Sequence, residues 1–342
     1  VLKDLLGRCM KVGYDTLLLT VDVPYETRRE HDIRNGISVP PQFNLSTLAQ
    51  MVTHPEWALR MLFAGVPQFV NVQPYFNTGS TYPFDDHKMR PAMMLAGERF
   101  EAVKALIDRG LAADRTFPEG TAYLLNTSDK ARSVRAGQFG IAKAELGALL
   151  PIEEIEADSI TGRQDVLFYF TGLTQVPNLG TLKFLPGALA DHLTSFGGQL
   201  TDSKQMSSLR WLEAGATASY GTVTEPCNHP QKFPMPAVAI FHYLSGATAI
   251  ESYWKSVAWP GEGLFIGEPL ARPFAPSMNK TSEDTYQLNL ISPKKTVWRI
   301  EQSDSIMGPF QPATRGLPVV AGKNTLRIAI PSGTKAYIRL VR

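Results

Sequence analysis

The stretch RQDVLFYFTGLTQVPNLGTLKFLPGALADHLTSFGG, residues 163–198, contains two strand candidates separated by a region with Pro and Gly. DVLFYF is a short, continuous apolar run that is rich in aromatic residues. A run of this kind is typical of a strand that is buried on both faces of a sheet. GALADHLTSFGG, residues 187–198, is the second candidate, for a strand or a turn. Because such strands occur in sheets that helices cover on both sides, this stretch predicts an α/β domain.

The segments on either side of this stretch alternate between helical and extended patterns. In chain order the sequence predicts a helix at 97–110 with Gly110 as its C-cap, a strand at 121–128, a helix beginning at Ser128 or Asp129, a helix at 207–215 and a strand candidate at 216–223. Strands that alternate with helices indicate a largely parallel sheet with both faces covered.

The two ends of the chain have different patterns. From about Thr285 the apolar period is two, and the segments 286–292, 296–303, 325–331 and 335–341 predict a small antiparallel β-sandwich. At the N-terminus a helix at 1–14 is followed by the apolar strand DTLLLTVDVP at 15–24 and a charged loop at 25–36. A further helix is predicted over 45–62. A helix, a buried strand and a charged loop at the strand's carboxyl end indicate a truncated βα-barrel fragment.

Composition excludes several classes of protein. The 342 residues carry a formal net charge of +2 and no long block of one sign, so binding to nucleic acid through bulk charge is not expected. No apolar run approaches the ~18 residues of a membrane-spanning helix. The two cysteines, Cys9 and Cys227, cannot form a disulfide framework or a cysteine-only zinc site. The first residue is Val1, and nothing near it has the pattern of a signal peptide.

A run near the N-terminus resembles a known flavoprotein family. GYDTLLLTVDVPYETRREHDIRNGISVPPQF, residues 13–43, contains LTVDVP, RRE-x-D, RNG and PP. These pieces together resemble the FMN-dependent α-hydroxy-acid dehydrogenases and oxidases, over residues 1 to about 72. The resemblance implies that Thr20 contacts the flavin, that Asp22 orients and charges a catalytic histidine, and that Arg29 binds the substrate carboxylate. A planar guanidinium suits a carboxylate, which it binds through two parallel hydrogen bonds.

The chain departs from this family in two respects. Thr27 stands where the family usually has Gly, and no His-Gly pair of the family's H-G-G-R segment occurs anywhere in the sequence. That segment supplies the base that accepts the substrate's proton. We therefore expect no bound cofactor, with an FMN-dependent 2-hydroxy-acid dehydrogenase of the L-lactate type as the alternative.

The remainder of the chain, from about Pro74, resembles an uncharacterised bacterial family of often exported proteins. The motifs that carry this resemblance include RPAMMLAG, PGALADHLTSFGG and SLRWLEAGATASYGTVTEPCN. More distantly the region resembles the caspase-like fold of the gingipain cysteine peptidases. In that comparison Leu173 stands where the catalytic His would be, Ser195 stands about where the Cys would be, and Gly267–Pro269 replaces a late Gly-Asp-Pro. Because the thiolate and its base are both missing, we expect no peptidase activity of this type.

Polar residues gather where the predicted strands end, which is where ligands bind in open α/β sheets. One group contains Asp191, His192, Thr194 and Ser195, and the next contains Glu225, Cys227, Asn228 and His229. Three interpretations stay open: a hydrolase with Ser195 as nucleophile, a metal site formed by His192, Glu225 and His229, or a structural role in capping strands. Asp191 and His192 are adjacent on a strand and would face opposite ways, so they cannot pair as in a catalytic triad.

These patterns lead to a prediction for the whole chain. We expect a partial FMN-dehydrogenase-like βα fragment at 1–73, a caspase-like three-layer α/β domain at 74–280 and an Ig-like β-sandwich at 281–342. Because the two families do not normally occur together, we expect a chimeric or truncated protein with its junction near Gln73–Pro74. The α/β body is expected to bind a small molecule or a protein. It resembles exported proteins, whereas the dehydrogenase alternative implies a cytoplasmic location.

Overall fold

The structure is a computed structural model that describes residues 72–225, 228–282, 284–313, 316–330 and 337–341. The expected N-terminal elements, which are the helices at 1–14 and 45–62, the strand at 15–24 and the barrel fragment that they indicate, lie outside the described residues.

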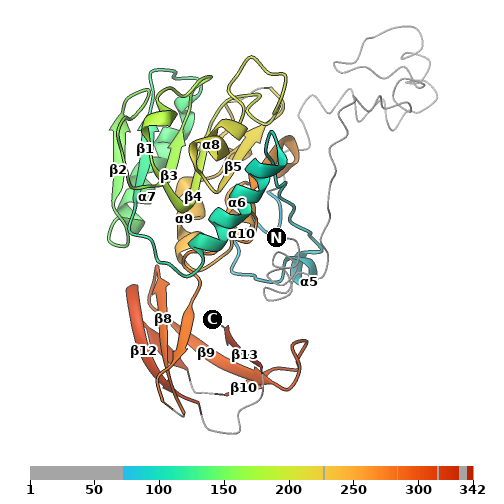
Figure 1. Cartoon of the computed structure of the whole chain (residues 1–342), viewed down its shortest axis with the longest axis vertical. Helices are drawn as coiled ribbons and strands as arrows, with labels where there is room; N and C mark the ends of the chain where they lie inside the picture. Colours follow the sequence, from blue (N-terminus) through green and yellow to red (C-terminus); the bar gives the residue numbers. More distant parts are fainter. Residues whose placement is uncertain (1–71, 226–227, 283, 314–315, 331–336, 342) are drawn as a thin grey trace, which may run out of the picture. The chain divides into compact units, whose positions relative to one another are not determined.

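A six-stranded sheet forms the centre of the α/β body (Figure 1). Its strands lie in the order β2-β1-β3-β4-β5-β6, with β1 to β5 parallel and β6 antiparallel to β5. Their bounds are β1 Thr121–Asn126, β2 Ile152–Glu156, β3 Val166–Thr171, β4 Phe184–His192, β5 Ala218–Thr222 and β6 Gly263–Gly267. The prediction of an α/β domain with a largely parallel sheet is thus confirmed.

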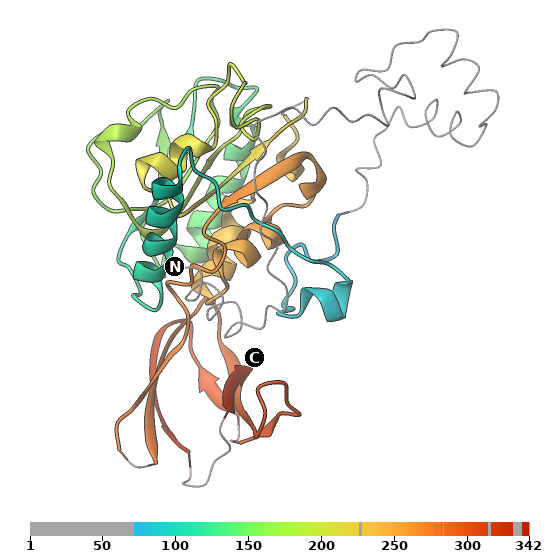
Figure 2. The same cartoon turned by 45° about the vertical axis from the view of Figure 1, so that its right-hand side comes forward.

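Helices cover both faces of this sheet (Figure 2). One face packs against α7 (Phe139–Leu146), α9 (Pro236–Leu244) and α10 (Ala249–Ser256), and the other against α6 (Phe100–Ala113) and α8 (Leu209–Ala214). Strand β3 shows why its sequence is apolar throughout. Phe168 packs against Tyr243 of α9 on one face, and Tyr169 packs against Trp211 of α8 on the other. Every residue of β3 is buried, because side chains on both of its faces meet a helical layer.

The prediction that Gly110 ends the first helix is wrong. Helix α6 continues to Ala113, and Gly110 lies inside it. A Cβ at this position would overlap the carboxylate of Glu268, which is fully buried. The glycine therefore permits close packing between α6 and the segment after β6, and it does not terminate the helix.

The helix after β1 also begins later than predicted. The chain first forms a turn, in which the Arg132 N–H donates to Asp129 Oδ1 (3.2 Å), and then the 3-10 helix η1 (Ser133–Gln138) leads into α7. Asp129 thus holds a turn instead of capping an α-helix. The remaining short helices are α5 (Pro83–His87), η2 (Leu179–Thr181), η3 (Pro230–Lys232) and η4 (Pro260–Glu262).

The segment from Gln73 to Leu95 attaches to the edge of the body beside β6. The Gln73 N–H donates to the Ala258 carbonyl (3.0 Å), and Gln73 Nε2 donates to the Trp254 carbonyl (2.8 Å). Further along, Met94 exchanges two backbone hydrogen bonds of 2.9 Å with Phe265 and Gly267. This pairing covers the outer edge of β6, which would otherwise present unpaired backbone groups.

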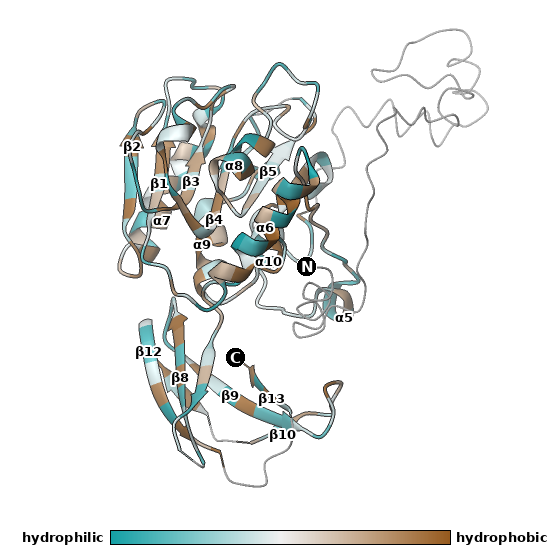
Figure 3. Cartoon of the chain, viewed as in Figure 1, coloured by the Kyte–Doolittle hydropathy of each residue, from teal (hydrophilic) through white to brown (hydrophobic). Residues whose placement is uncertain are grey.

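The C-terminal strands form two antiparallel sheets around a shared apolar core. Apolar and polar positions alternate along these strands (Figure 3), as in β9, where Trp298 and Ile300 are buried and Arg299 is exposed. The strands are β7 Ser277–Lys280, β8 Thr285–Ser292, β9 Thr296–Ser303, β10 Gln311–Pro312, β11 Leu317–Val319, β12 Gly322–Ala329 and β13 Tyr337–Val341. The predicted period-two strands are confirmed. Among the described residues, no helix is long and apolar enough to span a membrane.

Candidate functional site

The strand order places a topological switch point between β1 and β3. The chain leaves β1 toward β2 on one side and then crosses back to β3 on the other. In open α/β sheets, ligands bind beyond the carboxyl ends of the strands at such a point. This point is flanked by the residues that follow the two strands, 127–132 after β1 and 172–173 after β3.

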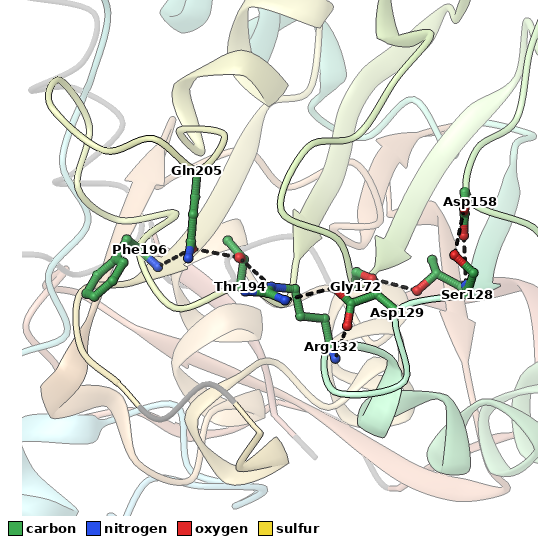
Figure 4. Close-up of polar contacts among 9 residues, drawn as sticks. Ser128, Asp129, Arg132, Asp158, Gly172, Thr194, Phe196 and Gln205 are labelled. Atoms are coloured by element: carbon green, nitrogen blue, oxygen red, sulfur yellow. Dashed lines mark hydrogen bonds and ion pairs between the residues drawn. The ribbon is translucent and has the colours of Figure 1, made fainter.

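Arg132 connects the loop after β1 to the loop after β4 (Figure 4). Its Nε donates to Thr194 Oγ1 (3.1 Å), and its Nη1 forms an ion pair with Asp129 (2.8 Å). The side chain of Arg132 is 21% exposed, and its Nη2 has no hydrogen-bond partner among the described residues. The guanidinium is thus partly available to a ligand. The ion pair with Asp129 offsets most of its charge.

Two close contacts fix the loops at the switch point. Thr127 Oγ1 donates to the Gly172 carbonyl at 2.6 Å. A Cβ on Gly172 would overlap the Arg132 carbonyl oxygen. Only glycine therefore permits the backbone after β3 to approach the backbone after β1 this closely. On the outer side, Asp158 accepts hydrogen bonds from the backbone and hydroxyl of Ser128, which lower the pKa of its carboxyl.

Gln205 occupies the space beside the end of β4. Its Oε1 accepts a hydrogen bond from Thr194 Oγ1 (2.7 Å) and another from the Phe196 N–H (2.8 Å), as Figure 4 shows. Because a backbone N–H can only donate, the carbonyl oxygen of Gln205 must face it. The two residues on either side of Ser195 are therefore held by the same side-chain oxygen.

Ser195 is not arranged as an activated nucleophile. It is fully buried, and its Oγ has no hydrogen-bond partner among the described residues. Nucleophilic catalysis by serine needs a base within hydrogen-bond reach. The N–H of the following residue, which often contributes to an oxyanion hole, already donates to Gln205. The geometry at Ser195 thus provides neither a base nor a free oxyanion donor from Phe196.

Asp191 and His192 point to opposite faces of β4, as their adjacent positions predicted. Asp191 forms a buried ion pair with Arg135 of η1 at 2.5 Å, and Arg135 Nη2 donates to the Thr171 carbonyl (2.8 Å). Burial raises the pKa of the Asp191 carboxyl to about 6, against the opposing effect of the Arg135 cation. This pair ties η1 to the ends of β3 and β4.

His192 is held on the other face as a neutral side chain. Its Nδ1 accepts a hydrogen bond from Trp211 Nε1 (2.9 Å), so its proton is on Nε2, which donates to the Met206 carbonyl (3.1 Å). Full burial lowers the pKa of His192 to about 3. Both ring nitrogens are occupied, so this histidine acts in packing and is not available as a base or a metal ligand.

The buried histidine predicts a dependence of stability on pH. In the unfolded chain His192 takes up a proton below its ordinary pKa of about 6.5, whereas in the folded protein it stays neutral down to about 3. Stability is therefore lost as the pH falls through this window, by roughly 3 kcal/mol at pH 4.5. The Tm difference between wild type and His192→Gln, which has no titrating group there, should shrink or reverse between pH 7 and pH 4.5. A difference that does not change with pH would contradict this.

The metal site that was one of the three open interpretations is not formed among the described residues. Although His192, Glu225 and His229 are all described, no group of three His, Cys, Asp or Glu side chains in the described part of the chain could hold a metal ion. His192 is enclosed by Trp211 and Met206, while Glu225 and His229 are exposed. Adjacent strand ends therefore did not bring these three side chains together.

The remaining predicted site residues belong to the N-terminal segment, and three residues of the site were not predicted from the sequence. Thr20, Asp22 and Arg29 lie outside the described residues. Sequence patterns did not identify Arg132, Arg135 or Gln205. Arg132 and Arg135 follow β1, so the rule that ligands bind at strand ends was a usable signal for them. Gln205 lies in the middle of a polar loop and had no such signal.

Comparison with known proteins finds a similarity for the N-terminal third of the chain. Residues 1–113 match the model of the FMN-dependent dehydrogenase family. The match extends past residue 72, where the resemblance was expected to end, to the last residue of α6. The chain thus contains an FMN-dependent-dehydrogenase-like segment.

Individual relatives agree with this class. A putative L-lactate dehydrogenase from Mycobacterium tuberculosis is 32% identical over 122 residues, which are 31% of this chain and 30% of the relative. An (S)-mandelate dehydrogenase from Pseudomonas putida is 28% identical over 144 residues, 41% of this chain and 34% of the relative. An L-lactate dehydrogenase from Vibrio parahaemolyticus is 28% identical over 150 residues, which are 43% of this chain and 37% of the relative. The chain spans about a third of the length of these relatives. No solved structure matches it.

The described residues do not by themselves fit an FMN site. A flavin in a βα-barrel lies at the carboxyl ends of strands that close into a ring. The sheet described here is open, with β2 and β6 at its two edges, and β6 runs antiparallel. An FMN site would therefore consist of residues before 72, together with strands from outside the described sheet.

Proposed function

We propose that this protein carries FMN-dependent 2-hydroxy-acid dehydrogenase function of the L-lactate type in its N-terminal segment. The observation that carries the proposal is the family match over residues 1–113, which the lactate and mandelate dehydrogenase relatives support. The family implies FMN as the cofactor, so the comparisons do not support the expectation of no cofactor. Bound FMN would accept the hydride of the 2-hydroxy acid.

In this proposal three residues before 72 have separate tasks. Arg29 binds the substrate carboxylate through its planar guanidinium, and Thr20 contacts the flavin. Asp22 orients a basic partner and raises its basicity. Because the sequence has no His-Gly motif, that partner must be another histidine of this chain or belong to a second chain. We also propose 1–73, 74–280 and 281–342 as domain boundaries.

The activity test is reduction of a dye by the full chain in the presence of FMN and L-lactate. Wild-type protein is expected to reduce the dye, and Arg29→Ala is expected to lower kcat/KM by at least ~100-fold, because a charged, two-bond contact with the substrate is lost. Arg34→Ala, in the same charged loop, is the matched control and should keep most of the activity. Equal activity in wild type and Arg29→Ala would overturn the role given to Arg29.

A second candidate function concerns the α/β body, which we propose to be a caspase-like domain that binds a ligand or a partner without peptidase chemistry. The three layers around β1–β6 support this proposal, as does the position of Ser195 after β4, next to β3 in the sheet. The partly available Arg132 at the switch point is the observation that favours a ligand. An Ig-like role for the C-terminal sheets and export are part of this second proposal.

Ser195→Ala tests whether the α/β body hydrolyses a substrate or only binds a ligand. Because Ser195 Oγ is buried and has no partner in the described part of the chain, its removal should change the free energy of unfolding by less than about 0.5 kcal/mol, or raise it slightly. No peptide or ester hydrolysis is expected in either protein. Hydrolysis by wild type that disappears in Ser195→Ala would show that Ser195 is a nucleophile and would overturn this reading.

A further inference from the structure

The side-chain oxygen of Gln205 accepts hydrogen bonds in a position where an oxygen of a bound ligand could accept the same ones. It accepts hydrogen bonds from two donors on either side of Ser195, the Thr194 hydroxyl (2.7 Å) and the Phe196 N–H (2.8 Å). Thr194 is fully buried, and its hydroxyl in turn accepts from Arg132 Nε (3.1 Å). Arg132 and Thr194 thus form a chain of donors from the switch point to one acceptor position, where the Phe196 N–H is the second donor (Figure 4).

Gln205 is well placed to leave this position. It belongs to the long loop between β4 and α8, and its side chain is only partly buried, whereas both donors are attached to the end of a central strand. Both donors also have support other than Gln205. Thr222 Oγ1 donates to the carbonyls of Thr194 (2.7 Å) and Ser195 (3.0 Å) and so holds the backbone, while Arg132 Nε donates to the Thr194 hydroxyl (3.1 Å). The donor arrangement therefore does not depend on the glutamine that now fills it.

We infer that the Thr194 hydroxyl, the Phe196 N–H and Arg132 form a binding site for the carboxylate of a small acid, which Gln205 occupies as an internal substitute in the unliganded protein. A carboxylate oxygen would accept the same two hydrogen bonds that the Gln205 amide oxygen accepts. Charged acceptors form stronger hydrogen bonds than neutral ones, so a carboxylate competes effectively with the amide. The inference rests on the ligand-binding role proposed for the α/β body.

The charges around the site set the expected affinity. Arg132 is paired with Asp129 at 2.8 Å, so the arginine contributes little net positive charge. A single carboxylate that must also displace Gln205 is therefore expected to bind weakly to the wild type. Removing the glutamine side chain removes this competition and should strengthen binding.

The experiment is an acetate titration of the full chain labelled with 15N-phenylalanine. The Phe196 amide resonance is assigned by its disappearance in Phe196→Leu, and sodium chloride at equal ionic strength is the salt control. In Gln205→Ala we expect a saturable shift of the Phe196 resonance, with at least ~10-fold tighter binding than in the wild type. The shift should be lost when Thr194→Val is added. Gln175→Ala, which removes an amide that donates to the Lys204 carbonyl (3.0 Å) outside the site, should behave as wild type.

No saturable shift in a folded Gln205→Ala protein, or the same shift in Gln175→Ala, would overturn the inference. Gln205→Glu gives a second test if Gln205→Ala does not fold. It places a carboxylate at the acceptor position within the chain, so we expect a Tm at pH 7 above that of the wild type, and no gain in a Thr194→Val background. A Tm equal to or below the wild type would overturn the inference. These outcomes are independent of Ser195, so they can be distinguished from a failure of the non-hydrolytic role.

Discussion

Arg135→Met is expected to destabilise the α/β body by about 3–5 kcal/mol. The side chains of Arg135 and Asp191 are 1% and 0% exposed and lie 2.5 Å apart. Removing the arginine leaves a buried carboxylate without its counter-ion and leaves the Thr171 carbonyl without the hydrogen bond from Nη2. Thermal unfolding followed by circular dichroism should show a fall in Tm of roughly 10 °C.

Two further variants show whether the buried charge is the cause. Arg163→Met removes an exposed ion pair with Glu153, in which the side chains are 44% and 42% exposed, and should cost less than about 1 kcal/mol. Adding Asp191→Leu to Arg135→Met removes the unpaired carboxylate and should recover part of the lost Tm. A double variant less stable than Arg135→Met would show that the stranded charge is not the main penalty.

Gly172→Ala is the second substitution with a large expected effect. The added Cβ would overlap the Arg132 carbonyl oxygen, and a backbone atom cannot move aside without displacing the loop after β1. We expect a loss of about 3 kcal/mol, at the upper end of the usual cost of overpacking. The displaced loop carries Arg132, so Gly172→Ala should also weaken any ligand binding at the switch point.

Gly140→Ala is the matched control for this substitution. Gly140 lies in α7, and a Cβ there would have no atom of a described residue within 4 Å. Alanine has a higher helix propensity than glycine, so this variant should be more stable than the wild type by up to about 1 kcal/mol. The free energy of unfolding of both variants is measured by urea titration. If Gly172→Ala were as stable as the wild type, the close approach of the two loops would be disproved.

The central sheet was predictable because its strands carry the pattern locally. The apolar run of β3 predicted a strand buried on both faces, and Phe168 and Tyr169 do pack into different layers. The positions of Asp191 and His192 on opposite faces followed from the two-residue period of a strand. Gly110 was misjudged because its role depends on Glu268, a residue more than 150 positions away.

The candidate site was less predictable, because its geometry depends on contacts between separate loops. Arg132 and Thr194 are 62 residues apart in the sequence, and neither belongs to a motif that indicates the other. The proposed metal site assumed that neighbouring strand ends bring their side chains together, but Trp211 and Met206 enclose His192. The N-terminal motifs predicted a family that the comparison supports over residues 1–113.

The most direct test of the proposed dehydrogenase function is the visible absorption spectrum of the full chain after incubation with FMN and removal of the free cofactor. If the N-terminal segment holds FMN, the protein should retain a stoichiometric flavin band, and addition of L-lactate without oxygen should bleach it. Arg29→Ala should keep the band but bleach much more slowly. A protein that stays colourless after incubation would contradict the proposal, and the function of the chain would then have to be sought at the Arg132 site of the α/β body.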